Sequence, residues 1–284
     1  MTSLKDLVAA APNLSCRPDS VVSLMEIIED PVVEAKKLVP IVEHDPGLAA
    51  GLLKLTNSTL YSFKRRIGSP QEALILVGNL TFARLCFTLS LEPILHRDLP
   101  GYNLDLDTLW QHSLTTAYGS AFLVKAMGLG EMRDRAFTAG LLHDIGKLVL
   151  DGGLAGEGPQ DDEETGSLRV TTDDEIRRTG YSHAEAGAAL LESWDLPEAT
   201  VEAVRFHHTP LKATRNRRLA LAVNVADQVA HFAPRLRPGS RAVDLWIKNN
   251  FTTGDFSHDV IGRLAGVIGS KKQNVMSLAL GPNL

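Results

Sequence analysis

The stretch VEHDPGLAAGLLKLTNSTLYSFKRRIGSPQEALILVGNLTFARL, residues 42–85, contains two helix starts of the same kind. Asp45-Pro46 and Ser69-Pro70 each place a capping side chain directly before a proline at the first helical position. Behind the first of these pairs, apolar residues recur at helical spacing, at Leu48, Leu52, Leu53 and Leu55. This part of the chain therefore predicts helices and not strands.

Similar helix-start signals recur along the rest of the chain. A serine or threonine followed three residues later by glutamate can form a capping box, in which each side chain bonds the other's backbone. The further signals are Asp30-Pro31, Ser69 with Glu72, Thr172 with Glu175, and Ser182 with Glu185. Strand-like alternation is almost absent, and its best short candidate is SLRVTT at residues 167–172. We therefore predict an all-α fold.

Composition limits the class of protein. The 284 residues are 44% hydrophobic, enough for one large domain or two smaller ones, and the formal net charge is −5. No apolar run is long enough to span a membrane, and the N-terminus does not resemble a secretory signal. Cys16 and Cys86 lack a CxxC spacing, which suits a reducing cytoplasm. The basic runs at 64–66 and 215–218 are interpreted as solvated turns, so a nucleic-acid-binding role ranks last.

One region departs from the helical pattern. Residues 151–167, DGGLAGEGPQDDEETGS, hold five glycines, six acidic residues and no basic one. Such a segment buries little apolar surface, so we expect a mobile loop. It is either an exposed acidic insertion or a lid beside the adjacent His143-Asp144 pair, and the sequence leaves both open.

The nine histidines fall into two groups. His44, His96, His231 and His258 stand alone in polar contexts, and we expect them at the surface. The other five form an ordered series with two aspartates: His112, His143-Asp144, His183, His207-His208 and Asp227. Neutral imidazole and carboxylate together suit a first-row divalent metal, and a carboxylate can bridge two ions. Two such ions can hold a phosphate and generate a hydroxide nucleophile.

Each member of the series also has a simpler explanation. His112 could be a buried helix residue beside Trp110, and His183 follows the helix cap at Ser182. The pair His207-His208 precedes Thr209-Pro210, so it sits at a helix C-terminus, where histidine is favoured anyway. Asp227 could be a polar residue on an amphipathic helix. Only the ordered set favours a metal site over these alternatives.

The series resembles the HD-domain phosphohydrolase superfamily. The form His143-Asp144-Ile145-Gly146-Lys147 and the later histidine pair are similar to the HD-GYP phosphodiesterases that cleave cyclic di-GMP. This resemblance implies Asp144 and Lys147 as catalytic residues, with Lys147 facing phosphate. It implies as metal ligands His112, His143, Asp144, His183, His207, His208 and Asp227. After the histidine pair the chain runs TPLKATRNRRLA and lacks the DGxGYP segment, which argues against cleavage of cyclic di-GMP.

The N-terminal half resembles the HDOD domain, the HD-related output domain of bacterial signalling. The pattern DPxL, LL, NSxxY and I.S in residues 42–85 carries this resemblance, and residues 180–208 continue it. It covers roughly residues 10–235 and implies an N-terminal helical part over 1–100 and an HD-type helical bundle with the metal site over 101–235. The remaining residues, 236–284, carry no recognised motif and are interpreted as a helical extension or tail.

Two functions follow from the resemblance. The first is a bacterial signal-transduction module that acts mainly as a regulatory output domain and retains an HD-type, dinuclear metal site. The alternative is an active metal-dependent phosphohydrolase or phosphodiesterase acting on a nucleotide or on a substrate like a cyclic dinucleotide. We expect iron or manganese, as one or two ions, because related two-metal proteins use them and the ligand set has no thiolate. The expected partner is a signalling protein or a phosphate-containing small molecule, with no nucleic acid and no membrane.

Overall fold

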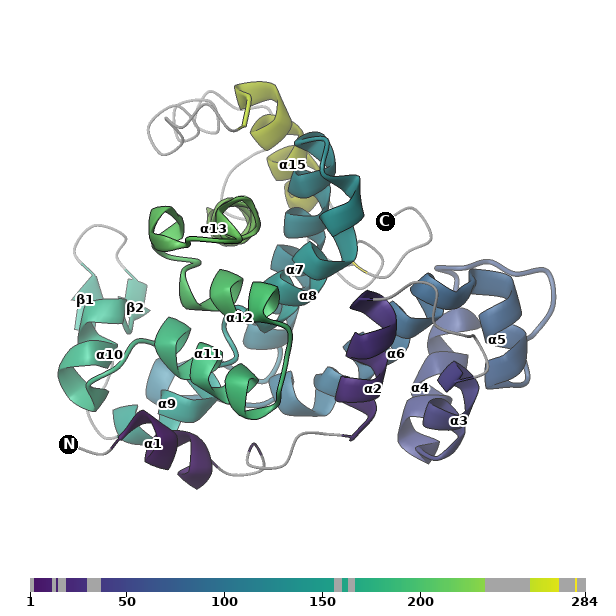
Figure 1. The fold of residues 1–284 in the computed structure, drawn as a ribbon, viewed down its shortest axis with the longest axis horizontal. Coiled ribbons are helices and arrows are strands. Elements are labelled where there is room, and N and C mark those ends of the chain that lie inside the picture. Colours follow the sequence, from purple (N-terminus) through teal and green to yellow (C-terminus); the bar gives the residue numbers. More distant parts are fainter. Residues whose placement is uncertain are drawn as a thin grey trace.

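The computed structural model describes residues 3–11, 14, 19–29, 37–155, 160–162, 167–232, 256–270 and 279. Figure 1 shows helices in almost every part of the fold, beside one short pair of strands, which confirms the predicted all-α class. The first helices are α1 (Leu4–Ala10), α2 (Asp19–Glu29), α3 (Leu38–Glu43), α4 (Pro46–Thr56), α5 (Pro70–Val77) and α6 (Asn79–Leu95). In Figure 1, α3, α4 and α5 form one end of the molecule, and α2 and α6 lie between them and the rest.

The remaining helices form a bundle at the other end (Figure 1). In chain order they are η2 (Pro100–Tyr102), α7 (Thr108–Ala126), η3 (Gly130–Met132), α8 (Arg133–Leu142), α9 (Lys147–Leu154), α10 (Thr172–Thr179), α11 (His183–Ser193), α12 (Glu198–Arg205), η4 (Pro210–Lys212), α13 (Arg217–Phe232) and α15 (His258–Ser270). The last of these lies within residues 236–284, for which a helical extension or tail is expected. Within the described residues, no helix is both long and apolar enough to cross a membrane.

The helix starts follow the capping signals, with two differences. Asp45 and Ser69 accept hydrogen bonds from the backbone N–H three residues on, as predicted. Glu72, however, accepts from the N–H of Gly68 at 3.0 Å and so does not close a box on Ser69. The predicted box of Thr172 with Glu175 is wrong by one residue, because Thr171 and Asp174 form it. The Ser182–Glu185 box is confirmed, while Asp30-Pro31 lies outside the described residues.

The acidic segment was only partly predicted. Residues 151–154 continue helix α9 and are not loop, because Leu154 is buried in the main core. Further on, β1 (Gln160–Asp162) and β2 (Ser167–Arg169) pair as a short antiparallel ladder. The second strand agrees with the candidate at residues 167–172.

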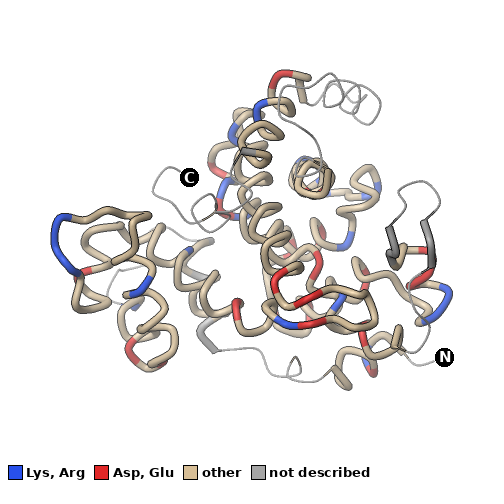
Figure 2. The backbone as a smooth tube through the Cα atoms, turned by 180° about the vertical axis from the view of Figure 1, so that it is seen from behind, with Lys and Arg blue, Asp and Glu red and all other residues tan. Residues whose placement is uncertain are grey.

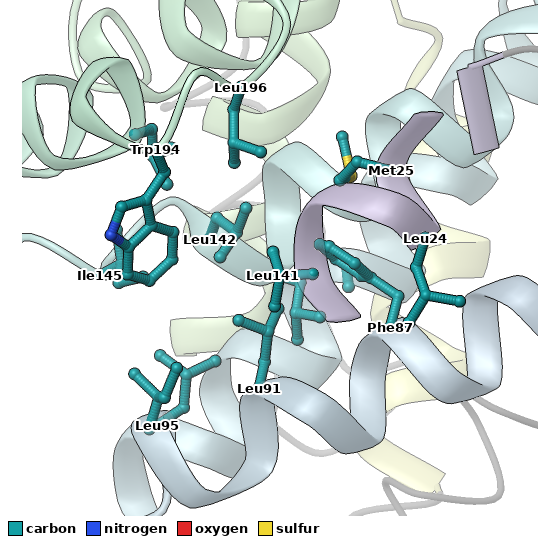
Figure 3. Packing of buried hydrophobic residues seen from close by; sticks show 14 of the residues in the cluster. Leu24, Met25, Phe87, Leu91, Leu95, Leu141, Leu142, Ile145, Trp194 and Leu196 are labelled. Atoms are coloured by element: carbon teal, nitrogen blue, oxygen red, sulfur yellow. The ribbon is translucent and has the colours of Figure 1, made fainter. Parts of the chain in front are cut away.

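One apolar cluster joins the two ends of the molecule. Phe87, Leu91 and Leu95 of α6 point into the same core as Leu141 and Leu142 at the end of α8 (Figure 3). Leu24 and Met25 of α2 lie against this core from the other side (Figure 3). The buried indole of Trp194 donates to the carbonyl of Leu14 at 3.1 Å, which ties the N-terminal segment to the bundle. The last turn of α8, which precedes His143-Asp144, is thereby fixed by packing from both ends.

Small residues let the bundle helices approach closely. A Cβ added at Gly140 of α8 would lie 2.7 Å from Ser120 Oγ of α7. One added at Gly119 of α7 would lie 2.9 Å from the Cβ of Ala226 on α13. Because α8 and α13 both pack this tightly on α7, polar side chains on the facing sides of these helices are brought together.

Charged residues lie mostly at the surface of this frame. In Figure 2 the basic run at 64–66 is the blue stretch at the outer end of the loop between α4 and α5. All three of its residues are exposed, and so are Arg215, Arg217 and Arg218 in the second basic run. For residues 64–66 this agrees with the interpretation as a solvated turn, whereas Arg217 and Arg218 form the start of α13, so the second run is only partly a turn.

Candidate metal centre

A first group of candidate ligands comes from α7, α8 and α13. His112 lies on α7, His143 directly follows α8, and Asp227 lies on α13. The Nε2 of His112 is 3.2 Å from the Nε2 of His143 and 3.0 Å from Oδ1 of Asp227. His143 Nε2 and Asp227 Oδ1 are 3.6 Å apart. Side chains from the consecutive helices α7 and α8 and from the later helix α13 thus converge on one point.

A second group comes from the region where α11 begins and α12 ends. His183 is the first residue of α11, and His207-His208 follow the last residue of α12. The Nε2 of His183 is 3.3 Å from that of His207 and 2.9 Å from that of His208. The ligand atoms of these three histidines all lie within 4.8 Å of one another, which is compatible with one shared ion.

Asp144 lies between the two groups. Its Oδ2 is 3.4 Å from His143 Nε2 and 3.6 Å from His112 Nε2, while its Oδ1 is 3.2 Å from His183 Nε2. One carboxylate therefore presents one oxygen to each group. Every histidine and aspartate of the ordered series meets in this one place.

Backbone carbonyls determine which ring nitrogens face inward. His143 Nδ1 lies 2.8 Å from the carbonyl of Gly140, and His207 Nδ1 lies 2.6 Å from the carbonyl of Val204. A carbonyl oxygen only accepts, so both Nδ1 atoms carry the proton and donate it. The Nε2 atom, which faces the other ligands, is then the one free to bind a cation.

Facing nitrogens and carboxylate oxygens need a positive charge between them. Burial, together with the neighbouring histidines, holds the pKa of His207 well below its usual range and lowers that of His208 to about 4. These two rings stay neutral and accept. Burial also acts to lower the pKa of His183, but Glu175 and Asp144 outweigh it and raise the value to about 9. Asp144 and Asp227 raise the pKa of His143 in the same way.

The aspartates are ionised in this setting. Burial opposes ionisation of Asp144, yet His143, Lys147 and His183 together hold its pKa well below the usual range. Hydrogen bonds from His112 and His143 do the same for Asp227. Neutral imidazoles and ionised carboxylates, without a thiolate, fit a first-row divalent metal, and such an ion would displace the ring protons on binding.

Lys147 lies next to the bridging aspartate. Its Nζ is 2.6 Å from Asp144 Oδ2 and 5.9 Å from the centre of the Tyr102 ring. Burial acts against its charge, but Asp144 outweighs this and raises the pKa of the ammonium group. Lys147 is therefore a fixed positive charge at the edge of the centre.

A cavity of about 510 Å³ opens onto the centre. Its wall includes Asp144, Lys147, Thr108 and Thr171. His231 also lines it, with its ring 6.4 Å from that of His112 and edge-on to it. The expectation that His231 is a solitary surface histidine is therefore wrong, because one more turn of α13 places it above Asp227. His44 and His258 are exposed as expected, and His96, partly buried, pairs with Asp107 at 2.9 Å.

Glu175 is the residue that sequence reasoning assigned wrongly. The capping box predicted for it would have placed its carboxylate at the solvent-exposed start of α10. It is instead 1% exposed, and it accepts from the Nδ1 of His183 at 2.7 Å. Helical spacing could have indicated this position. If Thr171 and not Thr172 is taken as the N-cap of α10, Glu175 falls on the buried side of the helix.

Comparisons with known proteins agree with this geometry. The profile of the HDOD domain family matches residues 14–210. An uncharacterized protein of Treponema pallidum (strain Nichols) is 27% identical over 217 residues, which make up 72% of this chain and 39% of that protein. The chain thus spans well under half the length of this relative.

Two solved structures share the fold. An HDOD domain protein of unknown function from Geobacter sulfurreducens superposes with a TM-score of 0.73 at 23% identity, covering 96% of this chain and 94% of that one. A protein from Shewanella amazonensis SB2B, whose name suggests a phosphohydrolase, gives a TM-score of 0.72 at 23% identity, covering 96% of each chain. The family match spans most of the chain and confirms the resemblance seen in the sequence. The chain therefore belongs to the HDOD domain family.

Proposed function

We propose that this chain is a signalling protein whose HD-type centre binds two divalent metal ions and hydrolyses a phosphate ester. One observation carries the proposal: the two oxygens of Asp144 face two separate groups of ligands, each within reach of a single ion. Three sets of ligand atoms lie within 4.8 Å of one another: those of His112, His143 and Asp144, those of His183, His207 and His208, and those of His143, His207 and Asp227, which lie where the two groups meet. If the centre held a single ion, one of the two groups of ligands would have no ion to bind.

The residues divide into distinct roles. The first position is held by His112, His143, Asp144 and Asp227, and the second by Asp144, His183, His207 and His208. Two bound ions would supply Lewis acidity toward a phosphate ester and lower the pKa of water. Iron or manganese remains the proposed metal, because the ligands are imidazole and carboxylate only.

Lys147 and the cavity favour hydrolysis over metal binding alone. The ammonium group lies on the cavity wall beside Asp144, where it can neutralise a phosphate oxygen as a point charge. The cavity of about 510 Å³ beside it has room for a small phosphate-bearing molecule. Names of solved neighbours suggest a phosphohydrolase and a signal transduction protein, which agrees with the proposal, although likeness at this identity extends to the fold alone.

Metal analysis of the purified protein tests the proposal. We expect close to two equivalents of iron or manganese per chain, and nearly none in Asp144→Ala, because Asp144 serves both positions. Asp98→Ala removes an exposed carboxylate that is not one of the proposed ligands, so this control should keep both equivalents of metal. The metal-loaded protein should hydrolyse bis(p-nitrophenyl) phosphate, and Asp144→Ala should not. Full metal occupancy in Asp144→Ala would contradict the ligand assignment.

A regulatory role without turnover is the second candidate. The absence of the DGxGYP segment after His207-His208 favours it, since the chain lacks the element that shapes the dinucleotide pocket in the resembled phosphodiesterases. In that case the protein would bind two ions and retain a phosphate-bearing ligand unchanged. Metal occupancy together with no release of p-nitrophenol would select this role over hydrolysis.

A further inference from the structure

Glu175 is a buried carboxylate that supports one ligand of the centre. Its oxygens accept from the His183 Nδ1 at 2.7 and 2.8 Å, from the His183 backbone N–H at 2.7 Å and from the Tyr102 hydroxyl at 2.9 Å. It lies on α10, whereas His183 begins α11. Within the described part of the chain, its only ion-pair partner within 4 Å is His183.

The two proposed metal positions differ in negative charge. The first has Asp227 to itself and shares Asp144, whereas the second has three imidazoles and only the shared oxygen of Asp144. A divalent ion at the second position would therefore meet less charge from its direct ligands. Glu175 supplies the missing charge through the ring of His183. A carboxylate behind a ligating histidine fixes the ring and raises the basicity of the nitrogen that faces the metal.

Tyr102 holds Glu175 in place from the opposite side. Burial, together with Glu175, raises the pKa of the Tyr102 hydroxyl, so it stays protonated and donates. The turn η2 that carries Tyr102 is itself fixed, because the Gly101 N–H donates to Asp151 at 2.8 Å and a Cβ at Gly101 would lie 2.3 Å from a backbone oxygen of α9. The carboxylate of Glu175 thus has a rigid donor on each side and little freedom to turn away.

We propose that Glu175 is a positioning residue that determines whether the second metal position, formed by His183, His207 and His208, is occupied. This inference rests on the proposed metal centre. It goes beyond it, because the two positions are predicted to differ in their dependence on a residue that touches neither ion. In Glu175→Gln the shape is kept but the negative charge is lost, and the amide can present an N–H to the ring.

Manganese titration of the metal-free protein by calorimetry tests this inference. We expect the wild type to take up two equivalents. We expect Glu175→Gln to bind one equivalent with unchanged affinity and the other about 10- to 100-fold more weakly. Glu185→Gln is the matched control. Glu185 belongs to the capping box of α11, the helix that begins with His183, and its carboxylate bonds Ser182 and not the ring of His183. This variant should bind both equivalents as the wild type does.

The outcomes separate the inference from the proposed function. If the wild type takes up no metal, the proposed centre fails, and the inference fails with it. If the wild type binds two ions and Glu175→Gln does so with unchanged affinities, only the inference is overturned. Equal loss in Glu185→Gln, or equal weakening of both equivalents in Glu175→Gln, would also overturn it.

A milder variant keeps the test decisive if Glu175→Gln does not fold. Tyr102→Phe removes one donor to Glu175 and leaves the ring in place. We expect it to weaken the same single equivalent, by less than Glu175→Gln would. Unchanged binding of both ions by a folded Tyr102→Phe, with Glu175→Gln unfolded, would count against the inference.

Discussion

The interior of helices α4–α6 and that of the bundle treat polar groups differently. In the first, buried hydroxyls bond within their own helix: Thr56 donates to the carbonyl of Leu52, and Thr88 donates to that of Arg84, both at 2.8 Å. In the bundle, His143, His183 and Glu175 are equally buried, but their side chains meet groups from other helices. Apart from Arg84 of α6, whose buried guanidinium donates to Asp134 of α8 at 3.1 Å, the buried polar side chains of the first part bond within their own helix. The ionisable groups of the second part meet only when the whole bundle has formed.

This difference indicates that α4–α6 serve mainly to pack the fold, whereas the bundle holds the groups that could act chemically. Buried ionisable groups lower stability unless they are paired, so a fold that keeps so many of them in one place gives up stability there. Apolar burial in α4–α6 carries no such cost. Because one apolar cluster runs through both parts, we still expect a single unfolding transition.

The largest effect should come from the packing side. Leu52 of α4 is fully buried, and Leu52→Ala should lower the free energy of unfolding by about 3 kcal/mol, since it leaves a cavity. Denaturant unfolding measures this change, and metal content measured beside it should equal that of the wild type. Loss of metal in a folded Leu52→Ala protein would show that the two interiors are not separate in function.

Metal removal should act on the bundle side. An ion present at 100-fold its dissociation constant stabilises the folded state by about 2.7 kcal/mol. We expect manganese to raise the melting temperature above that in chelator, and hydrogen exchange to slow in α8, α11 and α12 more than in α4 and α5. Asp144→Ala should show neither change. Equal slowing of hydrogen exchange in α4 would contradict the view that metal binding stabilises the bundle more than α4–α6.

The glycine of the HDxGK form sharpens the comparison further. A Cβ at Gly146 would lie 1.9 Å from the His183 carbonyl and 2.4 Å from the Gly187 nitrogen, both backbone atoms. Gly146→Ala should therefore destabilise the protein by about 2 kcal/mol and move His183 away from the other ligands, with loss of metal. Gly152 lies within α9, and a Cβ added there would meet no atom within 4 Å. Gly152→Ala should therefore be neutral or slightly stabilising. Thermal melts and metal analysis of the two variants decide this.

Local signals in the sequence were enough for most of the fold. Cap-then-proline pairs act within one turn, so Asp45 and Ser69 could be read as helix starts without the tertiary structure. The order of histidines and aspartates likewise indicated the candidate ligands through a family resemblance. The structure adds that all of them converge and that Asp144 stands between two groups, which spacing alone does not contain.

What the sequence did not reveal depends on tertiary contacts. Thr171 and Thr172 are equivalent as caps by residue type, and only the backbone shows that Thr171 is used. That shift of one residue decides whether Glu175 faces water or His183. His231 was missed for a related reason: its sequence context is polar, and the cavity that it lines is formed by residues from across the bundle.

The smallest effect we expect comes from a bundle carboxylate outside the centre. Glu202 of α12 accepts from the backbone N–H groups of Thr214, Arg215 and Asn216 at 2.7 to 3.1 Å, which joins α12 to the start of α13. Partial burial acts to raise its pKa, but these donors outweigh it and hold the value at about 2, below the ordinary 4.5. A group with a lowered pKa stabilises the fold above its unfolded value and loses that contribution as the pH falls toward the folded one.

Glu202→Gln should therefore cost about 1 kcal/mol at neutral pH, and the cost should fade between pH 4.5 and pH 2. Urea unfolding of both proteins across this range measures it as a difference, which removes the titration of the other carboxylates. Metal binding at neutral pH should be unchanged, because backbone donors satisfy Glu202 and no ligand histidine does. A difference that grows as the pH falls would show that Glu202 is held by something other than its charge.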